Sequence, residues 1–279
     1  MAARALCVGI NEFANLPAAN WLHGCVNDAT DLAALLKKHY GLTSRGTTVL
    51  TDAQATKAAV MGALSSMVEA AKQGTVDHIV FTFSSHGTQV PDTDGDETDK
   101  LDEAFVTYDI AQKGDQWDTD TVIVDDELHA LFADVPQGVL VEVLLDTCHS
   151  GTGLRDLDIL LGRRPRFLPA PTPRGVEAAN AVIDRRGLAD LAKLIPAARR
   201  PVLFAACTSS QTASDATFEG RSNGAFTYFL AKALDANTAL TRSSLLTQIS
   251  AGLKEGSFTQ RAQLEASTMA KRAAFGALG

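Results

Sequence analysis

Short apolar runs alternate with amphipathic segments along most of this chain. Runs bounded by polar residues in this way are typical of buried strands. The expected strands are Ala5–Ile10, Thr47–Leu50, His78–Phe83, Val139–Leu145, Val202–Ala206 and a last one at Lys271–Ala277. Apolar residues at helical spacing predict helices at Asp28–His39, Thr56–Lys72, Phe226–Leu234 and Ser243–Leu253.

This alternation of strands and helices favours an α/β fold. We expect a mainly parallel sheet of about six strands with helices on both faces. A chain of 279 residues with 46% hydrophobic residues is large enough for one full core.

Two segments depart from the alternating pattern. Asp92–Glu127 is rich in carboxylates, and Leu154–Arg200 is rich in arginines and prolines. Long connections of this kind are usually functional or mobile. The alternative interpretation of the acidic segment, without a specific function, is a solvated loop.

Two of the expected strands end in reactive side chains. His78–Phe83 leads to His86, and Val139–Leu145 leads to Cys148. Ligands of an open parallel sheet bind beyond the carboxyl ends of its strands, so these two residues are expected over one crevice. A thiol beside an imidazole is the arrangement of a nucleophile and its base.

The backbone N–H groups of Gly87 and Cys148 are candidates for an oxyanion hole in this crevice. Small polar residues after Cys148 favour an exposed turn over a core position. His149 is a poor candidate for the base, because neighbours on an extended turn point apart. A buried structural cysteine and a satisfied histidine at a strand end are the alternatives.

Composition narrows the function classes. The net charge of −8 gives no basic face for nucleic acid. The chain has too short an N-terminal apolar run for a signal peptide, and no stretch long enough for a membrane span. The four cysteines are scattered, which favours a reducing, cytoplasmic location. We expect a monomer.

The two strand-end motifs resemble the His and Cys motifs of metacaspases and their bacterial relatives, the orthocaspases. The separation of 62 residues from His86 to Cys148 also fits. Ser85 departs from the pattern, since a glycine is commoner there. The likeness covers most of the chain and includes Val8–Asn11, Phe83–Gly87, Asp146–Gly151, Gly24–Ala29 and Ala206–Ala213.

The resemblance implies a caspase-like fold in a single domain, 1–279. Within it, 1–153 would match a caspase large subunit, 154–200 a mobile linker and 201–279 a small subunit. It also implies a cysteine endopeptidase acting on proteins and peptides. The alternatives are a catalytically silent scaffold or binding protein on the same fold, and a thiol hydrolase or acyltransferase with other substrates.

The resemblance also implies a substrate pocket. Asp28 and Asp146 match positions that line the metacaspase pocket for the residue before the scissile bond (P1), and Ser84 matches a further lining position. Cys25, in the motif before Asp28, is grouped with them. Two buried carboxylates favour a cation, so Arg or Lys is expected at P1. The alternative for Asp28 is a purely structural role as a helix N-cap.

Calcium is the implied cofactor, since several carboxylates suit this hard cation. The positions that match the ligands of calcium-dependent metacaspases are Asp102, Asp125 and Asp126. The fourth ligand position falls on Arg155, and Asp156 is its nearest substitute.

An enzyme that cleaves after basic residues is expected to cut its own arginine-rich linker. Arg164 and Arg200 each precede a proline, which blocks cleavage. The favoured sites among the linker arginines are Arg163, Arg174, Arg185 or Arg186.

Overall fold

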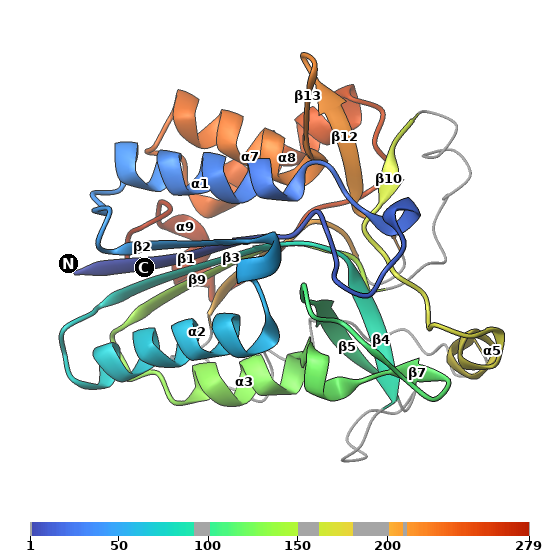
Figure 1. Ribbon diagram of the computed structural model, residues 1–279. Coiled ribbons are helices and arrows are strands. Elements are labelled where there is room, and N and C mark those ends of the chain that lie inside the picture. The colour runs from blue at the N-terminus through green and yellow to red at the C-terminus, as the bar shows by residue number, and fades with distance from the viewer. Residues whose placement is uncertain (1, 92–100, 150–161, 181–200, 209–210, 279) are drawn as a thin grey trace.

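The computed structural model describes residues 2–91, 101–149, 162–180, 201–208 and 211–278 (Figure 1). Its centre is a six-stranded sheet in the order β14-β11-β9-β3-β1-β2. Every neighbouring pair is parallel except β11 and β14. The strands are β1 (Ala3–Gly9), β2 (Thr47–Thr51), β3 (His78–Ser84), β9 (Leu140–Asp146), β11 (Val202–Ala205) and β14 (Gln263–Glu265). The predicted α/β fold with a mainly parallel six-stranded sheet is confirmed.

Helices cover both faces of this sheet. In Figure 1, α1, α7 and α8 lie on one face, and α2 and α3 lie on the other. Among the described residues, no helix is long and apolar enough to cross a membrane. The α-helices are α1 (Cys25–His39), α2 (Lys57–Lys72), α3 (Asp125–Ala133), α5 (Pro173–Asn180), α7 (Ala225–Ala236), α8 (Arg242–Glu255) and α9 (Thr268–Arg272).

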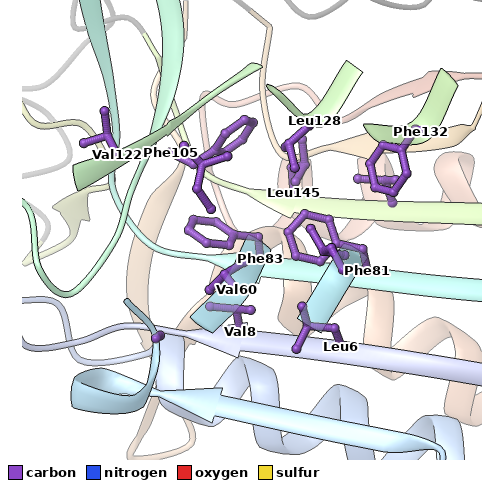
Figure 2. Close-up of a cluster of buried hydrophobic side chains, with 14 of the residues drawn as sticks. Leu6, Val8, Val60, Phe81, Phe83, Phe105, Val122, Leu128, Phe132 and Leu145 are labelled. Carbon is purple, nitrogen blue, oxygen red and sulfur yellow. The ribbon is translucent and has the colours of Figure 1, made fainter. Parts of the chain in front are cut away.

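The central strands β3 and β9 are buried along their whole length. Continuous apolar runs such as theirs are expected for parallel strands covered on both faces. Figure 2 shows the core between the sheet and α2 and α3, where Phe81 and Phe83 of β3 meet Phe105 and Phe132. This packing fixes the positions at which β3 and β9 end.

Smaller elements surround the carboxyl ends of the sheet. Three-stranded sheets have the orders β4-β5-β8 and β10-β12-β13, and β6 pairs with β7. Their strands are β4 (Gly87–Pro91), β5 (Leu101–Val106), β6 (Gln112–Lys113), β7 (Gln116–Trp117), β8 (Val122–Val124), β10 (Arg164–Pro165), β12 (Ser214–Phe218) and β13 (Arg221–Gly224). Short 3-10 helices are η1 (Ala18–Asn20), η2 (Asp52–Gln54) and η3 (Thr119–Thr121).

Two predicted elements differ from the structure. The expected strand Lys271–Ala277 is wrong, because Ser267 caps a helix that begins just before it, its hydroxyl accepting from the N–H of Ala270. The last strand is instead β14, at the sheet edge. Helix α1 begins at Cys25 rather than Asp28, since the side-chain oxygen of Asn11 accepts from the N–H of Cys25.

Candidate active site

The strand ends bring the predicted reactive residues together. Ser84 of β3 is the register partner of Asp146 of β9, and His86 and Cys148 follow each of them by two residues. Both side chains are buried, with exposed fractions of 4% and 1%. The expected exposed turn at Cys148 is therefore wrong in this state of the chain. The reason is that the segment around Arg166 lies across it, as its hydrogen bonds show.

The imidazole of His86 is oriented by backbone. Its Nε2 lies 2.7 Å from the carbonyl oxygen of Asn20, and its ring packs 5.4 Å from that of Phe13. A bond to a carbonyl requires a proton on Nε2, which makes Nδ1 the basic nitrogen. Sequence reasoning found no acidic residue to orient His86, and a backbone carbonyl leaves no signal in the sequence.

His149 lies in an apolar setting. Its ring meets Phe105 edge-on at 4.8 Å, and one ring nitrogen lies 3.2 Å from the hydroxyl of Thr147. Burial lowers the pKa of His149 to about 4. The ring is neutral near pH 7, so His149 packs against the site as an uncharged side chain.

The carbonyl oxygen of Arg166 lies at the position expected of an oxyanion. It accepts hydrogen bonds from the N–H of Gly87 at 2.9 Å and the N–H of Cys148 at 3.3 Å. These are the two donors that sequence reasoning assigned to the oxyanion hole. The thiol of Cys148 meanwhile donates to the carbonyl oxygen of Gln211.

The side chain of Arg166 is fully buried among three carboxylates. Its Nη2 lies 2.7 Å from Asp28 and 3.2 Å from Asp215, and its Nη1 lies 3.2 Å from Asp146. The same Nη1 donates to the backbone carbonyl of Asp146 at 3.1 Å. The acidic pocket, as we call Asp28, Asp146 and Asp215, thus holds an arginine of the chain itself.

Backbone and side-chain donors fix each carboxylate of the acidic pocket. Asp28 accepts from the N–H of Gly224, Asp146 from the N–H and hydroxyl of Thr227, and Asp215 from the N–H groups of His23 and Gly24. The N-cap interpretation of Asp28 does not hold, because it lies inside α1 and faces the pocket. Asp215 was missed, since a single acidic residue on a short strand gives no signal.

The charges of the acidic pocket perturb one another. Burial raises the pKa of Asp28 to about 7, although the guanidinium of Arg166 opposes the shift. The pKa of Arg166 is raised well above its usual value by the surrounding carboxylates, against the effect of burial. Three carboxylates face one guanidinium, so the pocket has more negative charge than a single cation neutralises.

Ser84 and Cys25 lie beside this pocket. Ser84 is buried and sits in register between Gly9 of β1 and Asp146 of β9. Cys25 is fully buried at the start of α1. Burial raises the pKa of its thiol, with the positive charge of Arg166 opposing the shift. Both residues are therefore close to the carboxylates with which they were grouped.

The segment around Arg166 crosses the site in an extended conformation. Pro165 of β10 pairs antiparallel with Ser214 of β12, and the N–H of Arg166 donates to the carbonyl of Ala213 at 2.9 Å. Beyond Arg166, the N–H of Leu168 donates to the carbonyl of Gly87 at 2.9 Å. An extended peptide that adds a strand to a sheet edge is a common mode of peptide recognition.

Three of the predicted calcium ligands lie in or next to the paired strands β5 and β8. Asp102 is in β5, and Asp125 and Asp126 begin α3 directly after β8. Asp102 and Asp125 are buried, with exposed fractions of 5% and 6%. In the part of the chain that the structure describes, no three His, Cys, Asp or Glu side chains form a group able to hold a metal. Asp156, and Arg155 beside it, lie outside the described residues.

The sheet, with a histidine and a cysteine at the ends of adjacent strands, is that of a caspase-like cysteine peptidase. A model of the metacaspase peptidase C14 domain matches residues 3–157. The chain belongs to the metacaspase family.

Curated relatives agree with this assignment. Metacaspase-1B of Aspergillus oryzae is 29% identical over 95% of this chain and 67% of its own length. Metacaspase-1 of Cryptococcus neoformans var. neoformans serotype D is 30% identical over 95% of this chain and 62% of its own length. Metacaspase-1B of Neosartorya fischeri is 32% identical over 95% of this chain and 69% of its own length. The chain spans about two thirds of the length of these relatives.

A solved structure shares the fold. The crystal structure of protein GSU0716 from Geobacter sulfurreducens matches with a TM-score of 0.64 and 26% sequence identity. The match covers 95% of this chain and 92% of the other.

Proposed function

We propose that this protein is a cysteine endopeptidase that cleaves after Arg or Lys through a dyad of Cys148 and His86. We also propose that it acts as a cytoplasmic monomer on protein and peptide substrates. The observation that carries the proposal is the placement of Arg166. Its side chain fills the acidic pocket while its carbonyl oxygen meets the N–H groups of Gly87 and Cys148. This is how a P1 residue must lie for attack on its carbonyl.

The chemistry follows from these positions. Cys148 turns from Gln211 and gives its proton to His86, and the thiolate attacks the carbonyl carbon of the P1 residue. The N–H groups of Gly87 and Cys148 stabilise the oxyanion. As the C–N bond breaks, His86 passes the proton to the leaving amine, and an acyl-enzyme remains on Cys148. His86 then deprotonates water, which hydrolyses the thioester and restores the thiol.

Self-processing is part of this proposal, and the bond we assign is Arg166–Phe167. Of the four sites favoured from sequence, Arg163 donates to carbonyl oxygens elsewhere and Arg174 lies in α5. Arg185 and Arg186 fall outside the described residues. Only Arg166, among the arginines that the structure describes, places its guanidinium against all three carboxylates of the acidic pocket.

The test is the fate of the purified chain. We expect the wild-type protein to give two fragments, 1–166 and 167–279, identified by intact mass. Cys148→Ala and His86→Ala should leave one chain, and Arg166→Lys should still be cut. A wild-type chain that stays whole and also turns over no basic peptide would favour the silent scaffold instead.

Peptide turnover tests specificity separately. Fluorogenic peptides with Arg, Lys or Asp at P1 should be cleaved in the first two cases only. The expected preference rests on the carboxylates of the acidic pocket, since an acidic P1 side chain would meet like charge there. Faster cleavage after Asp would overturn the assignment of the pocket.

We propose calcium stimulation as a distinct feature of this enzyme. Buried carboxylates at Asp102 and Asp125 support it, because buried oxygen ligands favour a divalent cation. Asp126 and Asp156 would complete the ligand set. Calorimetry should detect Ca²⁺ binding to the Cys148→Ala chain and its loss in Asp125→Asn. Equal rates of peptide turnover in calcium and in chelator would contradict stimulation.

A further inference from the structure

A second arginine of the crossing segment also has a specific site. The guanidinium of Arg163 donates from Nη1 to the carbonyl of Ser257 at 2.8 Å and from Nη2 to that of Gly256 at 2.7 Å. Its carbon Cζ lies 3.9 Å from the centre of the Phe258 ring. Two charge-assisted hydrogen bonds and a cation–π contact thus act on one side chain.

The fold prepares this site at the end of α8. The helix stops at Glu255, and a turn closes it through bonds from the N–H of Ser257 to Lys254 and from the N–H of Phe258 to Leu253. The carbonyls of residues 256 and 257 lie just past the helix end, where the helix dipole also favours a cation.

The aromatic wall of the site is held by other rings. Phe258 packs 5.8 Å from Phe218 and 6.3 Å from Phe229. A hollow of about 330 Å³ adjoins it, lined by Gly162, Arg163, Ala216, Thr217, Phe218, Gly256 and Phe258. The site is therefore concave and partly apolar, as specific ligand sites are.

The neighbouring Arg164 provides a contrast. It is exposed, and its Nη1 donates to the carbonyl of Trp21 at 2.9 Å. Among the described residues, no ring packs on Arg164 in the cation–π geometry seen at Arg163. Since Arg163 and Arg164 are adjacent arginines of the crossing segment, they form a matched pair for experiment.

We propose that Phe258 and the carbonyls of Gly256 and Ser257 form a second cation-binding subsite, which selects arginine three residues before P1, at P4. The inference rests on the proposed function, because the crossing segment is taken as a bound substrate with Arg166 at P1. The preferred substrates are peptides with the pattern Arg-x-x-Arg. Arginine suits the site better than lysine, because a planar fork can donate to two carbonyls while lying on a ring.

The test uses fluorogenic peptides that share Pro-Arg before the reporter. The enzyme is the Arg163→Ala/Arg166→Ala chain, in which the side chains of Arg163 and Arg166 cannot compete with the peptide. Replacing P4 arginine by alanine in Arg-Arg-Pro-Arg should lower kcat/KM about tenfold, and replacing it by lysine should lower kcat/KM by less than alanine does. Replacing P3 arginine by alanine should lower it less than about threefold.

A variant of the subsite completes the test. Phe258→Leu should remove most of the P4 preference, whereas Tyr228→Leu should keep it, since Tyr228 stacks on Phe218 and not on Arg163. If Phe258→Leu does not fold, the peptide with glutamate at P4 is compared with the P4 alanine peptide. A lower kcat/KM for glutamate supports a cation-binding subsite, and an equal or higher kcat/KM contradicts it. Equal turnover of the arginine and alanine peptides overturns this inference and leaves the proposed function standing. Failure to cleave any of them overturns both.

Discussion

Replacing Arg166 by alanine is the sharpest perturbation of this site. The change removes the guanidinium that contacts Asp28, Asp146 and Asp215, and it leaves three carboxylates around an emptied pocket. It should be made in the Cys148→Ala chain, so that self-cleavage does not affect the measurement. The quantity of interest is the free energy of unfolding relative to that parent.

The expected loss is about 3–5 kcal/mol at alkaline pH, which is typical when one partner of a buried ion pair is removed. The loss should shrink as pH falls. The pKa of Asp28 is about 7 with Arg166 present, and Arg166 holds it down, so the variant has a higher pKa. A carboxyl whose pKa is higher in the folded than in the unfolded state binds its proton more tightly in the folded state. Its contribution to the free energy of unfolding therefore falls as pH rises through the folded-state pKa. The extra penalty therefore develops above about pH 7.

Urea unfolding near pH 5.5 and near pH 8.5 should show this difference. The control is Arg164→Ala, an exposed arginine, with an expected loss below about 1 kcal/mol. N-acetyl-arginine amide should restore stability to the Arg166 variant alone, by about 2.7 kcal/mol at a hundred times its Kd. A loss at Arg166 no larger than at Arg164, or no rescue by the ligand, would refute the reasoning about the acidic pocket.

Three more predictions concern peptide turnover, all measured in the Arg166→Ala chain, whose pocket is open. Asp146→Ala should lower kcat/KM for P1 arginine at least about 100-fold, since the substrate cation loses a buried partner. Gly224→Ala should raise KM, because its Cβ would overlap the positions of Asp146 and the guanidinium, whereas Gly62→Ala meets open space and should change nothing. The pH profile of kcat/KM should rise through a pKa above about 7, as Asp28 ionises to bind the cation, and an unchanged profile in Asp28→Asn would contradict this.

Sequence reasoning reached those parts of the site that follow from local pattern. The apolar runs of β3 and β9 predict two adjacent buried strands, and in a parallel sheet their ends must lie together. The sequence pattern alone therefore predicts that His86, Gly87 and Cys148 lie together. The structure adds that Ser84 is the register partner of Asp146, which the sequence pattern did not predict.

Local sequence patterns could not identify residues whose role depends on distant parts of the chain. Asp215 reaches the acidic pocket through the antiparallel pairing of β12 with β10 and β13, which no local period specifies. Asn20 orients His86 through a backbone carbonyl, which any residue could supply. The sequence does not distinguish Arg166 from the other arginines of the linker. Which of them reaches the acidic pocket depends on how the segment pairs with β12.

The geometry around Arg166 also bears on the choice between arginine and lysine at P1. One amino group of the guanidinium contacts Asp28 and Asp215, and the other contacts Asp146 and its carbonyl. Because these acceptors lie around both arms of a planar fork, the single nitrogen of lysine cannot be within bonding distance of all of them at once. A lysine would leave at least one buried carboxylate without a cationic partner, and that carboxylate would have to take up a proton or water. Either basic residue brings one positive charge to the acidic pocket, but the shape of the pocket favours arginine.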